Sequence, residues 1–152
     1  MNIVEIPITR GLITRISQED FEMVKGHSWH ARPAKNTTYV AGWVDGKNTY
    51  LHRFLMGAAG RFQFVDHIDR DGLNNTRENL RFCTPAQNLA NSRSRLSKTG
   101  RRGVRRSMQG RWDAQIRKDG ELLFLGSFSS EHEAGIAYDS AFYAIYGFRW
   151  TP

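Results

Sequence analysis

The chain has 152 residues, enough for one ordinary domain or two small ones, and its 39% hydrophobic and 24% charged residues exclude a wholly disordered protein. No apolar run approaches the ~18 residues that a membrane span needs, and the N-terminus has no basic-then-apolar signal, so we expect a cytoplasmic protein without a membrane partner. The single cysteine, Cys83, excludes an internal disulfide and a cysteine-based zinc site.

The positive charge is concentrated in the C-terminal part of the chain. Of the net charge of +7, residues 1–91 carry +2, from 11 basic and 9 acidic side chains, and residues 92–152 carry +5, from 11 basic and 6 acidic ones. Residues 92–111 hold eight Lys and Arg and no acid. Such a run binds phosphates or forms a solvated linker. Residues 92–101 are rich in Ser and Arg and poor in apolar side chains, which predicts a basic linker between two modules.

Residues 1–54 predict several short strands and one short helix. β-branched and aromatic residues alternate with polar ones over residues 3–8, 11–16, 38–44 and 48–54, between Gly, Pro and Asn. Residues 17–24 begin with Ser17 and carry acids near their start, which is typical of a short helix. Trp29 is expected in the core.

Polar residues of several kinds gather between residues 64 and 91, which read FVDHIDRDGLNNTRENLRFCTPAQNLAN. Asp66 and His67 are adjacent at the end of an apolar strand, where alternation directs their side chains to opposite sides. A Gly-Leu-Asn-Asn loop follows. Thr84 is expected to cap a helix that begins at Pro85 and carries Asn88 one turn later.

This set of residues suits the hydrolysis of a phosphodiester, which needs a base to activate water and a cation to stabilise the charge on the phosphate. An ordinary histidine pKa near 6.5 makes His67 the predicted base. Mg²⁺ prefers oxygen ligands and keeps several waters, so Asp66 and Asn88 are the predicted ligands. The amide of Asn79 is predicted to tie the loop to the strand.

At these residues the sequence resembles the HNH nucleases, in the version found in phage and intron homing endonucleases, whose hairpin and following helix clasp one metal ion. Asp66 with His67, Asn79 and Asn88 take the three motif positions, and the upstream string YLHRFLMG extends the likeness to about Tyr50. The resemblance implies that His67 is the base and that Asp66 and Asn88 bind one divalent ion, Mg²⁺ or Mn²⁺ and not zinc. It also implies that Asn79 holds the loop and that products carry a 5′-phosphate.

His52 and Arg53 lie just ahead of this motif and have two readings. They either contact the scissile phosphate or anchor the fold, and the second reading is favoured. Asp69 and Asp71 flank a turn with Gly72 and are interpreted as turn formers rather than as ligands of a second metal.

The second module is predicted to be three strands and a helix. The strands fall at residues 101–106, 111–118 and 121–128, and Asp119-Gly120 between the last two is a hairpin signal. The helix begins at Ser129 or Ser130 with Glu133 in its first turn, and it ends at Gly147.

One face of this sheet is predicted to read DNA, because period-two alternation separates the apolar side chains of the middle strand from its polar ones. A β-structure fits the major groove, where Arg recognises guanine and Gln recognises adenine. Residues 102–147 are similar to the DNA-binding domain of the APETALA and ethylene-response family, although Ser107, Gln109 and Phe124 replace an Arg and two Trp that many plant members use against DNA. The predicted DNA contacts are Arg93, Arg95, Arg101, Arg102, Arg105, Arg106, Arg111, Gln115 and Arg117.

Together these features predict an α+β protein of two modules. Residues 1–91 are expected to form an HNH ββα-metal nuclease with an N-terminal β-rich extension, and residues 102–150 an APETALA-type domain of three antiparallel strands packed on one helix. The expected function is a metal-dependent endonuclease of phage or mobile-element origin, a homing-type nickase or double-strand cutter acting on double-stranded DNA as a monomer or homodimer. The alternative is a sequence-specific DNA-binding regulator without catalysis, and an RNA or junction nuclease is a weaker third reading.

Overall fold

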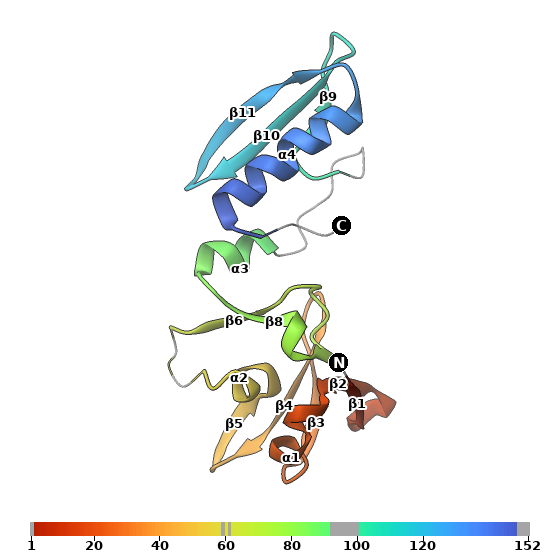
Figure 1. Cartoon of the computed structure of the whole chain (residues 1–152), viewed down its shortest axis with the longest axis vertical. Helices are drawn as coiled ribbons and strands as arrows, with labels where there is room; N and C mark the ends of the chain where they lie inside the picture. The colour runs from red at the N-terminus through yellow and green to blue at the C-terminus, as the bar shows by residue number, and fades with distance from the viewer. Residues whose placement is uncertain (1, 59, 61, 92–100, 149–152) are drawn as a thin grey trace. The chain divides into compact units, whose positions relative to one another are not determined.

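The chain divides into two compact units, residues 1–92 and 93–152, in a computed structural model that describes residues 2–58, 60, 62–91 and 101–148 (Figure 1). The class is α+β, with small sheets that are mostly antiparallel, as predicted. Most of the predicted linker, with Arg93 and Arg95, lies outside the described residues. No described helix has the length and apolar character that crossing a bilayer requires.

Three small sheets form the N-terminal unit. The first pairs β1 (Ile3–Pro7) with β2 (Ile13–Ser17) and, in parallel, β2 with the two-residue β7 (Asn74–Asn75). The second is antiparallel and consists of β3 (Trp29–Pro33), β4 (Thr38–Val44) and β5 (Lys47–Tyr50). The third pairs β6 (Phe64–His67) with β8 (Leu80–Cys83).

Short helical segments connect these strands. The 3-10 segments are Thr9–Gly11, Gln18–Asp20 and Arg77–Asn79, and the α-helices are α1 (Phe21–Val24), α2 (Leu51–Leu55) and α3 (Pro85–Asn91). The helix predicted over residues 17–24 is therefore confirmed as a 3-10 turn that continues into α1.

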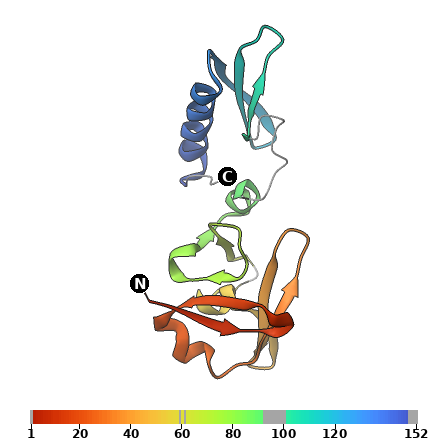
Figure 2. The same ribbon diagram turned by 90° about the vertical axis from the view of Figure 1, so that its right-hand side faces the viewer.

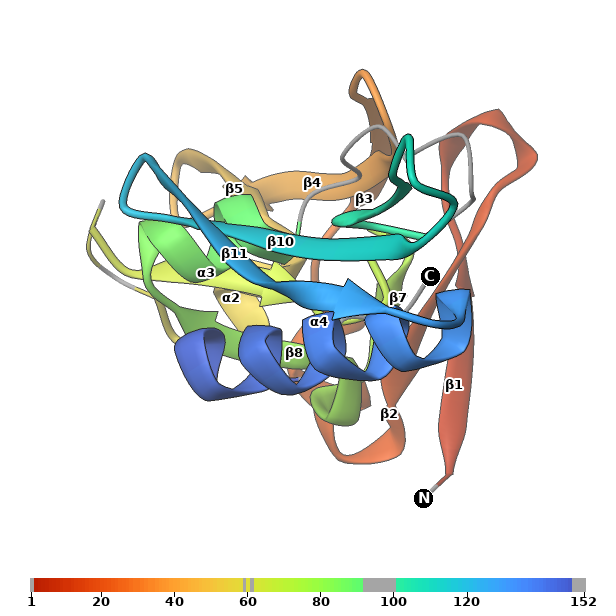
Figure 3. The ribbon, with the colours of Figure 1, turned by 90° about the horizontal axis from the view of Figure 1, so that it is seen from above.

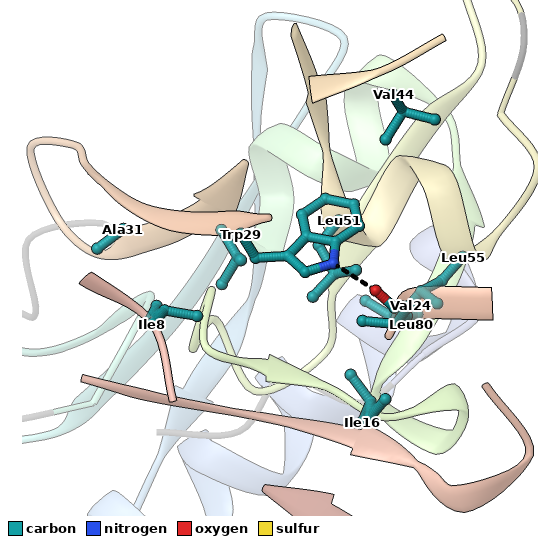
Figure 4. Close-up of a cluster of buried hydrophobic side chains, with 10 residues drawn as sticks. Ile8, Ile16, Val24, Trp29, Ala31, Val44, Leu51, Leu55 and Leu80 are labelled. Carbon is teal, nitrogen blue, oxygen red and sulfur yellow. Dashed lines mark hydrogen bonds between the residues drawn. The ribbon is translucent and has the colours of Figure 1, made fainter. Parts of the chain in front are cut away.

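The core of this unit forms around Trp29, which is buried as predicted. Its indole N–H donates to the Val24 carbonyl oxygen over 3.0 Å, so the ring fills the core without an unpaired donor (Figure 4). Ile16 from β2, Leu51 from α2 and Leu80 from β8 pack in the same cluster. Burying an aliphatic side chain of this size stabilises the fold by ~1.5–3 kcal/mol, so this cluster holds the three sheets together.

The strand predicted over residues 48–54 is wrong in its second half. The strand β5 stops at Tyr50, and α2 begins at Leu51. Leu51 and Leu55 are both buried, at the i, i+4 spacing of one helix face, and this burial decides the local conformation. The strands β3 and β7 were not predicted, since β3 carries Pro33 and β7 is only two residues long.

The C-terminal unit is an antiparallel sheet covered on one face by one helix, as predicted. Its strands β9 (Val104–Arg106), β10 (Trp112–Lys118) and β11 (Glu121–Phe128) lie in the order β11-β10-β9. The helix α4 (Glu131–Tyr146) runs along this sheet and contacts all three strands (Figures 2 and 3).

Local signals of the C-terminal unit are confirmed. Asp119 and Gly120 both have positive φ, 51° and 89°, which is the backbone of a type I′ hairpin turn. Ser130 and Glu133 form a reciprocal capping box at the start of α4, and Gly147 ends the helix in the left-handed conformation. Gly103, with φ of 67°, is required where the chain passes α4, because a Cβ there would lie 2.1 Å from the Tyr138 ring.

Candidate active site and nucleic-acid interface

A pocket of about 270 Å³ in the N-terminal unit collects most of the predicted catalytic residues. It is lined by Tyr39, Tyr50, His52, Arg53, Phe64, Val65, Asp66, His67 and Asn88. β6 supplies Asp66 and His67, and the helix α3, which follows β8, supplies Asn88. Thr84 caps α3 as predicted, because Thr84 and Gln87 exchange hydrogen bonds between their side chains and backbone N–H groups.

Asp66 is oriented by two residues for which we predicted no role. Arg81, its cross-strand neighbour on β8, donates to Oδ2 from Nη2 over 2.7 Å, and Asn91 donates to the same oxygen over 2.9 Å. Asn91 is 2% exposed and also donates to the His67 carbonyl oxygen. The hydrogen bonds from Arg81 and Asn91 all reach Oδ2 and fix the orientation of the carboxylate.

His67 is held in one tautomer by Asn75. The Asn75 amide nitrogen donates to Thr14 Oγ1 and to the Gly72 carbonyl oxygen, so its oxygen Oδ1 must accept the 3.1 Å hydrogen bond from His67 Nε2. The proton of the neutral ring therefore lies on Nε2, and Nδ1 keeps its lone pair. Burial lowers the pKa of His67, although the hydrogen bond to Asn75 and three nearby carboxylates oppose this shift. His67 is thus a neutral base near pH 7.

The support of His67 extends to the N-terminal β-hairpin. Thr14, on β2, is fully buried and donates its own proton to the Leu73 carbonyl oxygen, so it accepts from Asn75. Asn75 is also fully buried and belongs to β7, which pairs with β2. Nothing in the sequence pointed to Asn75 beyond its place in the Gly-Leu-Asn-Asn loop, because its partners lie 8 and 61 residues away.

Asn79 holds the loop between β6 and β8 and does not line the pocket. Its amide donates to Asp69 Oδ1 over 2.8 Å and to the Asn74 carbonyl oxygen over 2.7 Å, and its oxygen accepts from the Asp69 backbone N–H. Asp69 and Asp71 also accept backbone N–H groups two residues ahead of them. These carboxylates therefore shape the turn.

Arg53 and His52, the pair with two predicted readings, separate in the structure. The Arg53 guanidinium donates to the carbonyl oxygens of Ala58, Gly60 and Gln63. These hydrogen bonds hold the segment after α2 in place, which is a structural role. The His52 ring is 7% exposed and lines the pocket beside His67, with the two ring centroids 4.9 Å apart.

The pocket suits a hydrated divalent cation. Asp66 and Asn88 offer carboxylate and amide oxygens, the donor types that Mg²⁺ prefers. In the part of the chain that the structure describes, no three His, Cys, Asp or Glu side chains are grouped to hold an ion. An ion bound between Asp66 and Asn88 would therefore complete its coordination with water, as Mg²⁺ commonly does.

The predicted DNA contacts fall on two faces of the C-terminal unit. On β10 the buried Ala114 and Ile116 face α4, so Asp113, Gln115 and Arg117 occupy the outer face. The register adds Arg105 from β9, paired with Asp113, and Phe124 from β11, paired with Gln115. Phe124 is 62% exposed, which is unusual for a large aromatic side chain.

The described arginines that were predicted to contact DNA also have contacts within the unit. Arg102 lies on the helix side, its guanidinium 5.6 Å from the centroid of the Phe142 ring of α4. Arg106 lies over Trp112 at 6.0 Å, and Arg111 donates to the Ser127 carbonyl oxygen. Arg101 lies near Glu131, with 3.9 Å between Nε and the carboxylate. The alternation of the strands places Arg105, Gln115 and Arg117 on the outer face, where Arg105 lies 3.6 Å from the Asp113 carboxylate and Arg117 donates to the Gly120 carbonyl oxygen.

Homologues of the chain include a viral protein named as an endonuclease and plant proteins named as element-binding proteins and transcription factors. The chain is 27% identical, over 143 residues and 91% of its length, to an uncharacterized HNH endonuclease of Acanthamoeba polyphaga mimivirus, of which it covers 73%. Over 48 residues, 30% of its length, it is 54% identical to the dehydration-responsive element-binding protein 2C of Arabidopsis thaliana. It is 35% identical over 88 residues, 55% of its length, to an ethylene-responsive transcription factor of the same plant.

The chain spans only part of these plant relatives, 14% of the first and 54% of the second. No family model matches the chain, and no solved structure matches it.

Proposed function

We propose that the protein is a metal-dependent HNH DNA endonuclease whose C-terminal unit positions it on double-stranded DNA. The observation that carries this proposal is the pocket shared by His67, Asp66 and Asn88, in which the base has a defined tautomer and the carboxylate is oriented by Arg81 and Asn91. The nuclease module of the proposal is the hairpin β6–β8 followed by α3. The relative named as an HNH endonuclease, which aligns with 91% of the chain, supports the same reading.

The residues of the pocket divide the reaction between them. His67 Nδ1 takes a proton from a water molecule, and the resulting hydroxide attacks the phosphorus. Asp66 and Asn88 hold the divalent ion, proposed to be Mg²⁺ or Mn²⁺, which when bound stabilises the charge on the phosphate and the departing 3′-oxygen. The product then carries a 5′-phosphate. Asn75 and Asn79 act only by holding the base and the loop.

The outer face of the C-terminal sheet is proposed to enter the major groove. Arg105 and Arg117 suit guanine, Gln115 suits adenine, and the exposed ring of Phe124 suits the methyl group of thymine. The plant relatives that align with this unit are named as element-binding proteins and transcription factors, which supports DNA as the partner. Tethering this unit to the nuclease raises the local concentration of the active site near the selected sequence.

A plasmid-nicking assay with Mg²⁺ and with EDTA tests the proposal. We expect nicked circles with Mg²⁺ and none with EDTA, because one such centre cuts one strand in each engagement and a double-strand break needs a dimer or a second engagement. Intact plasmid in both lanes, with DNA bound, would instead identify the regulator without catalysis. Sequencing the ends produced from a randomised duplex library then gives the site and the strand, and an RNA competitor tests the preference for DNA. A homing-type role, an origin in a phage or mobile element and an action in the host cytoplasm complete the proposal.

A further inference from the structure

The His52 ring is enclosed at the wall of the pocket by three other rings. It lies in the first turn of α2 and is stacked on Tyr50 with 5.5 Å between centroids, while Tyr39 lies at 5.6 Å and His67 at 4.9 Å. The residue is only 7% exposed, yet it lines the pocket together with Asp66 and Asn88. Its ring is therefore held by aromatic packing against these three neighbours.

His52 differs from its neighbours in the pocket, because one nitrogen of its ring makes no hydrogen bond to the described part of the fold. Its Nδ1 is buried and has no hydrogen-bond partner among the described residues. The neighbouring residues are engaged, since His67 donates to Asn75 and Arg53 donates to three carbonyl oxygens. A buried histidine without a partner needs an explanation, because apolar aromatic residues fill such space without the cost of a desolvated nitrogen.

Burial, together with the neighbouring His67 and Arg53, lowers the pKa of His52 to about 3. The ring is therefore neutral near pH 7 and carries one proton. If this proton were on Nδ1, the N–H would be enclosed without an acceptor. A proton on Nε2 avoids this cost, because Nδ1 and not Nε2 is the buried ring nitrogen without a partner among the described residues and His52 lines the pocket.

We propose that His52 is a catalytic residue of the nuclease that donates a hydrogen bond from Nε2–H to a non-bridging oxygen of the scissile phosphate. This inference rests on the proposed function. A role as a ligand of Mg²⁺ is disfavoured, because this ion prefers oxygen donors to an imidazole nitrogen. The two imidazoles of the pocket then have opposite tasks. His67 offers a lone pair to water, and His52 offers a proton to the phosphate.

Three variants test this assignment in plasmid nicking with Mg²⁺. His52→Phe keeps an aromatic ring against Tyr39 and Tyr50 but has no donor, and we expect ~10²–10³-fold slower cleavage, the usual effect of removing one donor to a transition-state oxyanion. His52→Gln places an amide N–H near the position of Nε2 and should restore part of the rate. His27→Phe is the matched control, because the His27 ring also packs on aromatic rings, Trp29 and Phe54, and does not line the pocket.

The control measurements separate a catalytic role from a structural one. In gel shifts with EDTA, His52→Phe should bind DNA with the affinity of the wild type. In thermal unfolding, its melting temperature should be close to that of the wild type. The ¹⁵N spectrum of labelled imidazoles should show His52 with its proton on Nε2, and the Nε2 resonance should move when duplex is added in EDTA. A proton on Nδ1, or cleavage by a folded His52→Phe at the wild-type rate, would overturn the assignment while leaving the nuclease in place. A wild-type protein that does not nick would overturn both proposals.

Discussion

The two units of this protein place their functional side chains in opposite environments. In the N-terminal unit, Asp66 and His67 are 9% and 4% exposed and are held by hydrogen bonds with other buried side chains. In the C-terminal unit the Arg105 side chain is 61% exposed, and its ion pair with Asp113 spans 3.6 Å. A group that reacts needs one geometry, which burial enforces, whereas a group that reads DNA must reach a partner outside the fold. Substitutions should therefore affect cleavage in the first unit and affinity in the second.

The largest expected effect is that of His67→Ala. Removing the base should slow nicking by ~10²–10⁴-fold, the usual contribution of general base catalysis, while the C-terminal unit still binds DNA. Nicking rates and gel shifts on one preparation measure the two separately. Cleavage that persists near the wild-type rate would remove His67 from its role.

Asn75 tests how the buried site is supported, because its proposed effect on cleavage comes only from its hydrogen bond with His67. Asn75→Ala removes the acceptor of the Nε2 proton, so both tautomers become accessible and nicking should slow by about tenfold or more. Asn75→Asp keeps an acceptor but adds a negative charge, which raises the pKa of His67 and moves the acid limb of the pH–rate profile to higher pH. Asn48→Ala, at an exposed position on β5, is the control. An unchanged pH profile in Asn75→Asp would contradict the assignment.

Arg105 tests the other half of the comparison. Arg105→Ala should weaken binding to the selected sequence by ~1–3 kcal/mol if the side chain contacts a base, and change the free energy of unfolding by less than about 0.5 kcal/mol. Titrations by gel shift at two salt concentrations, with selected and random duplexes, distinguish a base contact from a phosphate contact. Equal weakening on both duplexes would assign Arg105 to phosphate, and an unchanged affinity on both would remove it from the interface.

The effect that is smallest near pH 7 concerns the stability of the fold, and it grows only as the pH falls. Unfolded histidine binds a proton near pH 6.5, but folded His52 does so only at about pH 3, so its contribution is complete above pH 6.5 and is lost as the pH falls toward 3. Each such group changes the free energy of unfolding by up to about 1.4 kcal/mol per pH unit in this window. Denaturant unfolding in EDTA at several pH values should show a shallower decline in His52→Phe than in the wild type. If the free energy of unfolding declined in parallel for the two proteins, His52 would bind its proton at the same pH in the folded and in the unfolded chain.

The features that could be read from the sequence are those made by residues close together along the chain. The capping box of Ser130 and Glu133, the turn at Asp119-Gly120 and the cap of α3 at Thr84 each depend on a few neighbouring residues. Such hydrogen bonds form wherever the local string allows them, so their pattern is visible in one dimension.

Tertiary structure alone decided how the site is supported. Asn91 reaches Asp66 across 25 residues and Asn75 reaches Thr14 across 61, and no local pattern links these pairs. The change from strand to helix at Leu51 likewise follows from the burial of Leu51 and Leu55 in the core. Contacts of this kind exist only after the chain has packed, because packing brings distant residues together and excludes the water that would otherwise satisfy them.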